Sequence, residues 1–213
     1  MAAAHRLPLF DLPPAQQRDW LTRRLAGPVP ASALDQSDGF RLPGREGSVI
    51  PAAVLVPLVN RPHGLQLLLT ERSANLLDHP GQISFPGGRV DPDDTGFAAA
   101  ALREATEEIG LARSHVKILG ELASYITVTG YRVHPVVGWV EPPIELKPDP
   151  IEVADAFEVP LVFVLDPAHH ERHSQLLGTR RREYWAIPWH ERYIWGATAA
   201  MLMILDRTLR AGD

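Results

Sequence analysis

Residues 103–111, Arg-Glu-Ala-Thr-Glu-Glu-Ile-Gly-Leu, constrain the fold of this chain more than any other stretch. Glu104, Glu107 and Glu108 are spaced i, i+3 and i+4, which places three carboxylates on one face of an α-helix. Like charges at this spacing weaken a helix unless a divalent cation binds between them. The opposite face carries the apolar residues Ala98, Leu102, Ala105 and Ile109. The pattern therefore predicts a helix from about residue 97, with one side in a core and the other facing a metal ion.

The segments that flank this helix support the same interpretation. Residues 85–88 are Phe-Pro-Gly-Gly, and an acidic loop follows at residues 91–94. A pair of glycines lets the backbone turn tightly and approach a ligand or metal closely. Gly110 stands where a left-handed helix C-cap favours glycine. The sequence predicts a loop, a short helix and a glycine stop.

From Gly88 to Leu111 the sequence resembles the Nudix box, the signature of hydrolases that cleave nucleoside diphosphates linked to another group. Its second half matches at every defined position, from Arg103 to Leu111. In its first half, Asp94 stands where the family has Glu, and eight residues instead of seven separate it from Arg103. The resemblance implies that the carbonyl of Gly88 joins Glu104, Glu107 and Glu108 in binding Mg²⁺ or Mn²⁺. Arg103 is expected to orient a carboxylate in this catalytic group, either Glu107 or an Asp94 that folds back to it.

A second motif at residues 68–88 resembles the signature of the coenzyme A pyrophosphatase branch of the Nudix family. It runs from Leu-Leu-Thr-Glu-Arg-Ser to Phe-Pro-Gly-Gly, and the second arginine of the pattern is replaced by Leu77. Arginine binds phosphate with two parallel hydrogen bonds, so this replacement bears on affinity or selectivity. The candidate substrate-binding residues are Arg72, Arg89, His79 and Gln82.

The carboxylates suit hydrolysis of a diphosphate, whose anionic oxygens repel a nucleophile until a cation neutralises them. Mg²⁺ and Mn²⁺ prefer oxygen ligands, and a nearby Glu can deprotonate a water that the metal activates. The sequence does not assign the general base. Glu152 and Glu158 are candidates for a further metal ligand or base, with Glu152 ranked first because it follows a Pro-rich loop. The alternatives are a solvated acidic face and a surface ion pair at Arg103.

Two further groups of residues have competing interpretations. His169, His170 and His173 form a loose cluster that suggests zinc, although their spacing is more typical of a solvated loop. Three tryptophans could stack on an adenine, but aromatics this close together in sequence more often belong to a core. They are Trp185, Trp189 and Trp195.

Composition sets outer limits on function. The chain has 213 residues, a net charge of −5 and no Cys. These values give no support to nucleic-acid binding and exclude disulfides and thiolate sites. The N-terminus lacks the apolar core of a signal peptide, and no stretch approaches the roughly 18 apolar residues of a membrane span. We therefore expect a cytoplasmic enzyme with a small-molecule substrate and no nucleic-acid or membrane partner; a homodimer is one arrangement that the sequence leaves open.

The periodicity of the chain predicts an α+β fold. We expect strands near residues 54–59, 65–70, 116–124, 131–140 and 181–189, a strand with a short helix within 151–166, and helices at 13–26 and 195–209. The Nudix resemblance implies a mixed β-sheet between α-helices, an α/β/α sandwich. We expect residues 1–48 to form an N-terminal helix and an extended connection packed on a Nudix domain at residues 49–213.

The function predicted from these observations is metal-dependent hydrolysis of coenzyme A, or of a CoA derivative, to 3′,5′-ADP and a phosphopantetheine. Two alternatives remain open. One is a Nudix hydrolase of another dinucleotide such as ADP-ribose or NADH, which Leu77 favours. The other is a non-catalytic sensor that binds a nucleotide.

Overall fold

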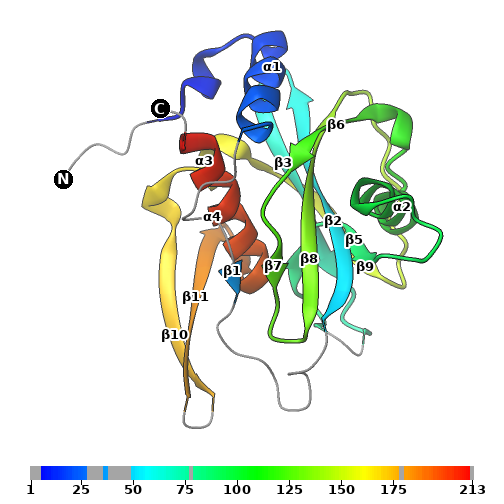
Figure 1. The fold of residues 1–213 in the computed structure, drawn as a ribbon, viewed down its shortest axis with the longest axis vertical. Coiled ribbons are helices and arrows are strands. Elements are labelled where there is room, and N and C mark those ends of the chain that lie inside the picture. Colours follow the sequence, from blue (N-terminus) through cyan, green and yellow to red (C-terminus); the bar gives the residue numbers. More distant parts are fainter. Residues whose placement is uncertain (1–5, 28–35, 38–48, 77–78, 178–179, 212–213) are drawn as a thin grey trace.

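The computed structural model describes residues 6–27, 36–37, 49–76, 79–177 and 180–211 (Figure 1). Leu77 lies outside the described residues, as does most of the connection predicted before residue 49. The division of the chain at residue 48 therefore stays a prediction.

In the described part of the chain, nine strands form one mixed sheet. The central path runs β1-β7-β8-β2-β3-β4, with β5 beside β2, β6 beside β8 and β9 beside β3. The strands are β1 (Gln36–Ser37), β2 (Ile50–Arg61), β3 (Gly64–Arg72), β4 (Ile83–Ser84), β5 (Gly87–Arg89), β6 (Val116–Glu121), β7 (Tyr125–Ile126), β8 (Tyr131–Val140) and β9 (Val153–Pro160). The β2 strand pairs antiparallel with β3 and parallel with β8. Its long apolar run, buried on both faces, is typical of a central strand between two layers.

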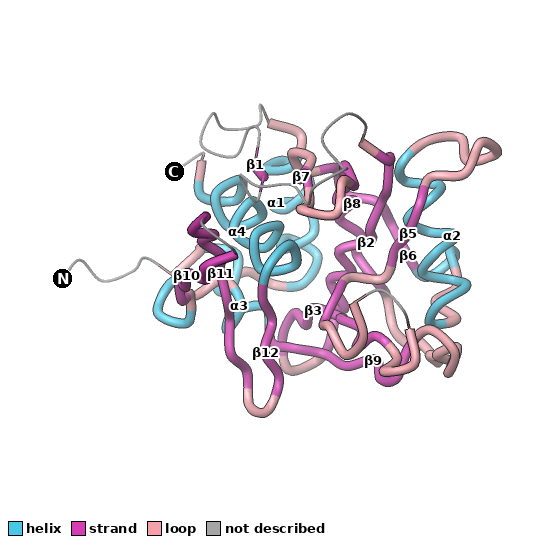
Figure 2. Tube along the Cα trace, turned by 90° about the horizontal axis from the view of Figure 1, so that it is seen from below, coloured by secondary structure: helices cyan, strands magenta, loops and turns pink. Residues whose placement is uncertain are grey.

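Helices cover both faces of this sheet, so the predicted α/β/α sandwich is confirmed (Figure 2). The helices are α1 (Pro14–Leu25), α2 (Phe97–Ile109), α3 (Leu161–Val164) and α4 (Gly196–Arg210), with short 3₁₀ turns at Pro8–Asp11, Arg113–His115 and Pro167–His169. On one face α2 packs on β2 and β5; on the other, α1 packs on β6 and α4 on β7.

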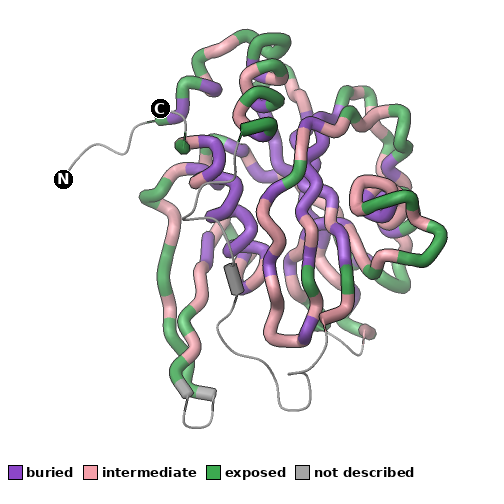
Figure 3. Tube along the Cα trace, in the orientation of Figure 1, coloured by how far each residue is buried: buried purple, intermediate pink, exposed green. Residues whose placement is uncertain are grey.

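A smaller antiparallel sheet stands beside α4 (Figure 1). It consists of β10 (Glu171–Leu177), β11 (Arg180–Trp189) and β12 (Arg192–Trp195). Ala186, Ile187 and Ile194 of this sheet are fully buried. As a result α4 is enclosed on most sides, and 12 of its 15 residues are buried (Figure 3).

Most predicted elements are confirmed, but several details differ. Gly87 and Gly88, predicted to lie in a loop, lie instead in β5, where they pair with Val54 and Ala53. The His169–His173 segment, interpreted as a solvated loop, ends in the strand β10. Across the described residues, no helix is both long enough and apolar enough to cross a membrane.

Candidate active site

Helix α2 carries the three glutamates and is held at its end by the chain around it. Gly110 adopts the left-handed conformation (φ 68°), and its N–H donates to the carbonyl of Thr106 at 3.0 Å. The amides of Lys147 and Asp149 donate to the carbonyls of Ile109 (2.8 Å) and Glu108 (2.9 Å). These bonds satisfy carbonyls that a helix end leaves unpaired. They also dock the loop before β9 against the helix that carries the glutamates.

The apolar side of α2 is rotated from the side that the sequence predicted. Its buried residues are Ala100, Ala101, Ala105, Glu108 and Ile109. Ala98 and Leu102 are only partly buried. The buried side therefore includes one of the three carboxylates, and the predicted separation of a core face from a metal face was wrong for Glu108.

Arg103 connects the acidic loop to the helix. Its Nε and Nη2 donate to the two carboxylate oxygens of Asp94 (3.2 and 2.9 Å), and Nη2 also donates to the carbonyl of Arg89 (3.0 Å). Its Nη1 donates to Glu104 (2.9 Å) and to Glu107 (3.0 Å). The guanidinium lowers the pKa of Asp94. Asp94 thus folds back to Arg103, although the spacing of the box differs from the family pattern.

Glu108 is a buried carboxylate. The residue is only 5% exposed, and the amide of Gly87 donates to its Oε2 at 3.1 Å. Burial raises the pKa of Glu108 to about 8, and the charges of Glu104 and Glu152 act in the same direction. A cation beside these groups would favour their charged forms.

Gly88 and Glu104 fit closely together. A Cβ on Gly88 would lie 2.5 Å from the carboxyl carbon of Glu104, so a larger residue there would displace that carboxylate. Burial raises the pKa of Glu104 as well, with further contributions from the charges of Glu107 and Glu152. The backbone of β5 and the Glu104 carboxylate are therefore in direct contact, as a site using both requires.

Glu152, directly before β9, acts on this cluster through its charge. Its charge raises the pKa of both Glu104 and Glu108, and its carbonyl accepts from the amide of Ser73 at 2.8 Å. Glu158, the lower-ranked candidate, lies six residues along β9, roughly 20 Å away at strand spacing. Arg61 binds its carboxylate with contacts of 2.6 to 3.2 Å.

Arg72 supplies positive charge next to the carboxylates. It ends β3, and its charge lowers the pKa of Glu108. Among the described residues, its Nε is one of three buried side-chain atoms without a hydrogen-bond partner. Gln82 is near it through its carbonyl, which accepts from the Arg72 amide (2.9 Å), and the exposed His79 (φ 58°) precedes Gln82 in the same loop. A buried donor without a partner is costly, and an anionic oxygen would satisfy it.

The side chains of other sequence candidates have partners outside the carboxylate cluster. The side chain of Arg89 donates to the hydroxyl of Tyr131 at 3.0 Å. Trp185 and Trp189 pack against the larger core.

His169, His170 and His173 do not form a common site, because each bonds to a different partner. His169 and His170 bond to the carbonyls of Phe163 and Val164, and His173 bonds to the carboxylate of Glu171.

As the side chains stand in the described residues, no three His, Asp or Glu are close enough together to hold an ion. The reason at α2 is visible in the contacts: Arg103 binds one oxygen each of Glu104 and Glu107, and the Gly87 amide binds one of Glu108. The other oxygens of these three carboxylates remain available, and hard oxygen donors are what Mg²⁺ and Mn²⁺ prefer. The donor chemistry of these residues therefore fits a divalent cation.

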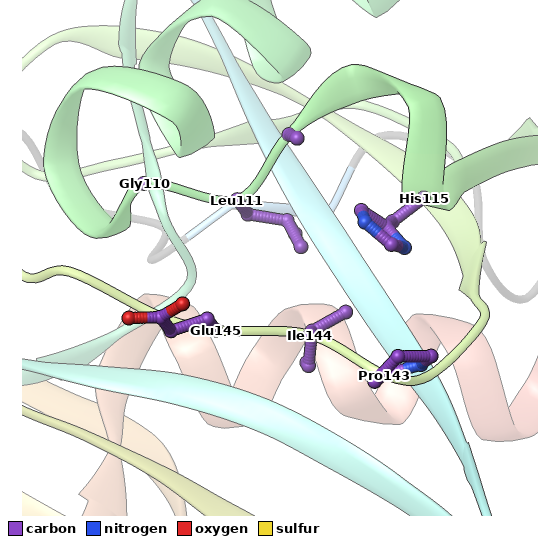
Figure 4. Close-up of a pocket in the computed structure, with 7 residues that line it drawn as sticks. Gly110, Leu111, His115, Pro143, Ile144 and Glu145 are labelled. Atoms are coloured by element: carbon purple, nitrogen blue, oxygen red, sulfur yellow. The ribbon is translucent and has the colours of Figure 1, made fainter.

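A pocket of about 410 Å³ lies beyond the C-terminal end of α2 (Figure 4). It is lined by Gly110, Leu111, Ala112, His115, Pro143, Ile144 and Glu145. None of these residues is a predicted site residue. The carboxylates and Arg72 offer the chemistry that a diphosphate needs, so we place the candidate site at their end of the sheet and not in this pocket.

Comparison with known proteins decides the family. The sequence model described as the NUDIX domain matches residues 49–178. The chain belongs to the Nudix family. The uncharacterised Nudix hydrolase NudL of Escherichia coli O6:H1 is 44% identical over 155 residues, which cover 71% of this chain and 78% of NudL. The crystal structure of a Caenorhabditis elegans Ap4A hydrolase complex covers 53% of this chain and 81% of its own, at 23% identity and a TM-score of 0.45.

The family assignment makes the chain a Nudix hydrolase that acts on a nucleoside diphosphate derivative. Nudix hydrolases generally use divalent metal ions. The docking of residues 147–149 on α2 was not predicted from the sequence. The signal available was general: the carbonyls at the end of any helix need partners.

Proposed function

We propose that this Nudix hydrolase cleaves the diphosphate of coenzyme A or of a CoA derivative in the presence of Mg²⁺ or Mn²⁺. The observation that carries the proposal is that Glu104 and Glu108 both lie against the glycines of β5, near the charge of an Arg72 whose buried Nε has no hydrogen-bond partner. A cluster of carboxylates and a cation binder suits a metal-bound polyphosphate. The preference for CoA rests on the motif at residues 68–88 and on no contact in the fold.

The proposed reaction is a hydrolysis. The oxygen of water attacks one phosphorus, the bridging P–O bond breaks, and the products are 3′,5′-ADP and 4′-phosphopantetheine or its acyl form. The metal would supply charge neutralisation and an acidified water. Glu104, Glu107, Glu108 and the carbonyl of Gly88 would hold it.

The remaining residues have distinct proposed roles. Arg103 would keep Glu104 and Glu107 in place through its bonds to both. Glu152 would serve as a further ligand or base. Arg72 would bind a phosphate oxygen, with Gln82 and His79 beside it, whereas Arg89 would have to leave Tyr131 to reach substrate.

The deciding experiment compares initial rates on CoA, ADP-ribose and NADH with Mg²⁺ and with Mn²⁺. We expect CoA to give the highest kcat/KM, and mass analysis in ¹⁸O-water to show one ¹⁸O in one product and identify the phosphorus attacked. If CoA is turned over no faster than the other two, the CoA proposal is wrong and the hydrolase acts on another dinucleotide.

The variant Glu107→Gln distinguishes a non-catalytic sensor from an enzyme. A sensor keeps its nucleotide affinity and has no turnover to lose, whereas an enzyme loses turnover. Homodimer formation, which the sequence left open, stays a prediction for sedimentation to test.

A further inference from the structure

The strands β3 and β9 lose their regular register at the point where they enter the candidate site. Their pairing is regular up to Glu71 and Asp155, and the next pair is Arg72 with Val153, so Ala154 is an extra residue. Beyond this bulge the Ser73 amide bonds to the carbonyl of Glu152. Bulges bend a strand and redirect the side chains that follow. Two of the proposed site residues, Arg72 and Glu152, emerge directly from this one.

Arg192, from β12 of the small sheet, binds both residues of the last regular pair before the bulge, Glu71 and Asp155. Its Nη1 donates to Glu71 at 2.8 Å and its Nη2 donates to Asp155 at 2.5 Å. The guanidinium also lies over the ring of Phe157, 3.6 Å from its centroid. Glu71 and Asp155 face each other directly across the two strands, and like charges in that arrangement destabilise a sheet. Arg192 converts this repulsion into a bridge between β3 and β9.

The bridge acts from the far side of the sheet. Leu67 and Leu69 of β3 pack into the core under α4, whereas Leu68 packs under α2. By the same alternation, Glu71 faces Arg192 and Arg72 faces α2. Arg192 therefore lies on the opposite face from the carboxylates. It also lies outside residues 49–178, which the Nudix sequence model matches.

We propose that Arg192 is a positioning residue for the hydrolase: by bridging Glu71 and Asp155 it fixes the bulge from which Arg72 and Glu152 reach the site. The inference rests on the proposed function for the roles of those two residues. On this proposal the small sheet, which contains Arg192, positions site residues as well as covering α4. The stack of Phe157 on Trp189 (centroids 6.1 Å apart) attaches the same part of β9 to β11.

The competing interpretation is a surface ion pair that only adds stability. The three side chains are partly exposed, at 25% for Arg192, 38% for Glu71 and 50% for Asp155. A purely stabilising pair affects the melting temperature and leaves the kinetic constants and metal affinity unchanged. A positioning residue changes how well Arg72 binds phosphate and Glu152 binds metal.

A matched control exists in the same sheet. Arg172 donates to Glu183 at 2.6 Å and lies 5.2 Å from the ring centroid of Trp185. It thus has an acidic partner and an aromatic partner, as Arg192 does, but the pair lies within the small sheet. Arg172→Ala removes a comparable contact without touching β3 or β9.

The test compares Arg192→Ala, Arg192→Lys and Arg172→Ala with the unaltered protein. We measure KM and kcat on CoA, the Mn²⁺ dissociation constant by electron paramagnetic resonance without substrate, and the melting temperature. For Arg192→Ala we expect a loss of about tenfold in Mn²⁺ affinity and a rise of about tenfold in KM, the scale found when outer partners of metal ligands are removed. Arg192→Lys should recover part of both, and Arg172→Ala should leave both unchanged.

A double variant without the two acidic partners tests whether Arg192 acts through its bridge to them. In Glu71→Gln/Asp155→Asn the repulsion is gone, so adding Arg192→Ala should change Mn²⁺ affinity much less than it does alone. The proposal is overturned if Arg192→Ala lowers the melting temperature but leaves Mn²⁺ affinity and KM unchanged. It is also overturned if the change keeps its full effect on the neutral background. Failure to hydrolyse CoA would sink the proposed function alone, because Mn²⁺ binding tests Arg192 without a substrate.

Discussion

The cores on the two faces of the main sheet differ in the size and polarity of their side chains. Under α1 and α4 lies the larger core, built from large apolar side chains such as Trp139 and Leu202. Under α2 lies a smaller core, with alanines on the helix and with the buried carboxylate of Glu108 at its border. Small side chains let α2 approach the sheet, which brings its glutamates to the backbone of β5. The α1 and α4 face therefore mainly stabilises the fold. The α2 face is less stable because it holds charged groups close together.

The largest expected effect comes from Glu107→Gln on the α2 face. We expect kcat to fall about a thousandfold, or ~4 kcal/mol of transition-state stabilisation, because a proposed metal ligand is lost. The Glu107 side chain is 58% exposed, so the melting temperature should hardly change. Turnover within tenfold of the unaltered enzyme would remove Glu107 from the catalytic group.

On the α4 face, a core substitution should lower stability and leave kcat unchanged. Leu202 is fully buried in α4, and Leu202→Ala should lower the free energy of unfolding by about 3 to 4 kcal/mol. The kcat of the folded fraction should stay the same, as measured by urea unfolding and by assays well below the midpoint.

Leu55→Ala is the matched change on the α2 face. Leu55 is also fully buried, and its amide bonds to the carbonyl of Pro86, directly before Gly87. Here both stability and kcat should fall. If Leu202→Ala reduces kcat as much as Leu55→Ala does, the two faces are not separable in function.

The buried carboxylate should make stability depend on pH. The pKa of Glu108 is raised to about 8 from an ordinary value of 4.5, so the folded protein holds this proton more tightly than the unfolded chain. The stabilisation is complete below the unfolded value and is lost as the pH rises towards the folded one. In metal-free protein, the free energy of unfolding should therefore fall by roughly 3 kcal/mol between about pH 5 and pH 8.

Urea unfolding in chelator measures this slope, and Mn²⁺ should flatten it. Glu108→Gln is the control, because it cannot titrate and its slope over the same range should be small. An equal slope in both proteins would assign the pH dependence to other groups.

These tests also mark what could be predicted from the sequence. The helix α2 and its cap at Gly110 depend on local spacing, and both were predicted correctly. The burial of Glu108 depends on Gly87, 21 residues away, and the bridge of Arg192 to Glu71 spans 121 residues. Neither contact leaves a periodic signal. The strand β10, Glu-Arg-His-Ser-Gln-Leu-Leu, was missed because it has no β-branched residue and forms only by pairing with β11.

The smallest effect, and the sharpest local comparison, comes from the two neighbouring glycines of β5. The three atoms nearest to a Cβ on Gly88 all belong to the carboxylate of Glu104, whereas a Cβ on Gly87 lies 2.5 Å from the backbone oxygen of Ala53, at a φ of 157°. Gly88→Ala should therefore displace Glu104 and lower kcat about thirtyfold, or ~2 kcal/mol, with little loss of stability. Gly87→Ala should instead destabilise the fold, because backbone atoms of β2 cannot move aside as a side chain can. Parallel urea unfolding and kcat measurements distinguish the two, and equal loss of activity and stability in both variants would mean that Glu104 is not held where the backbone of β5 leaves room for it.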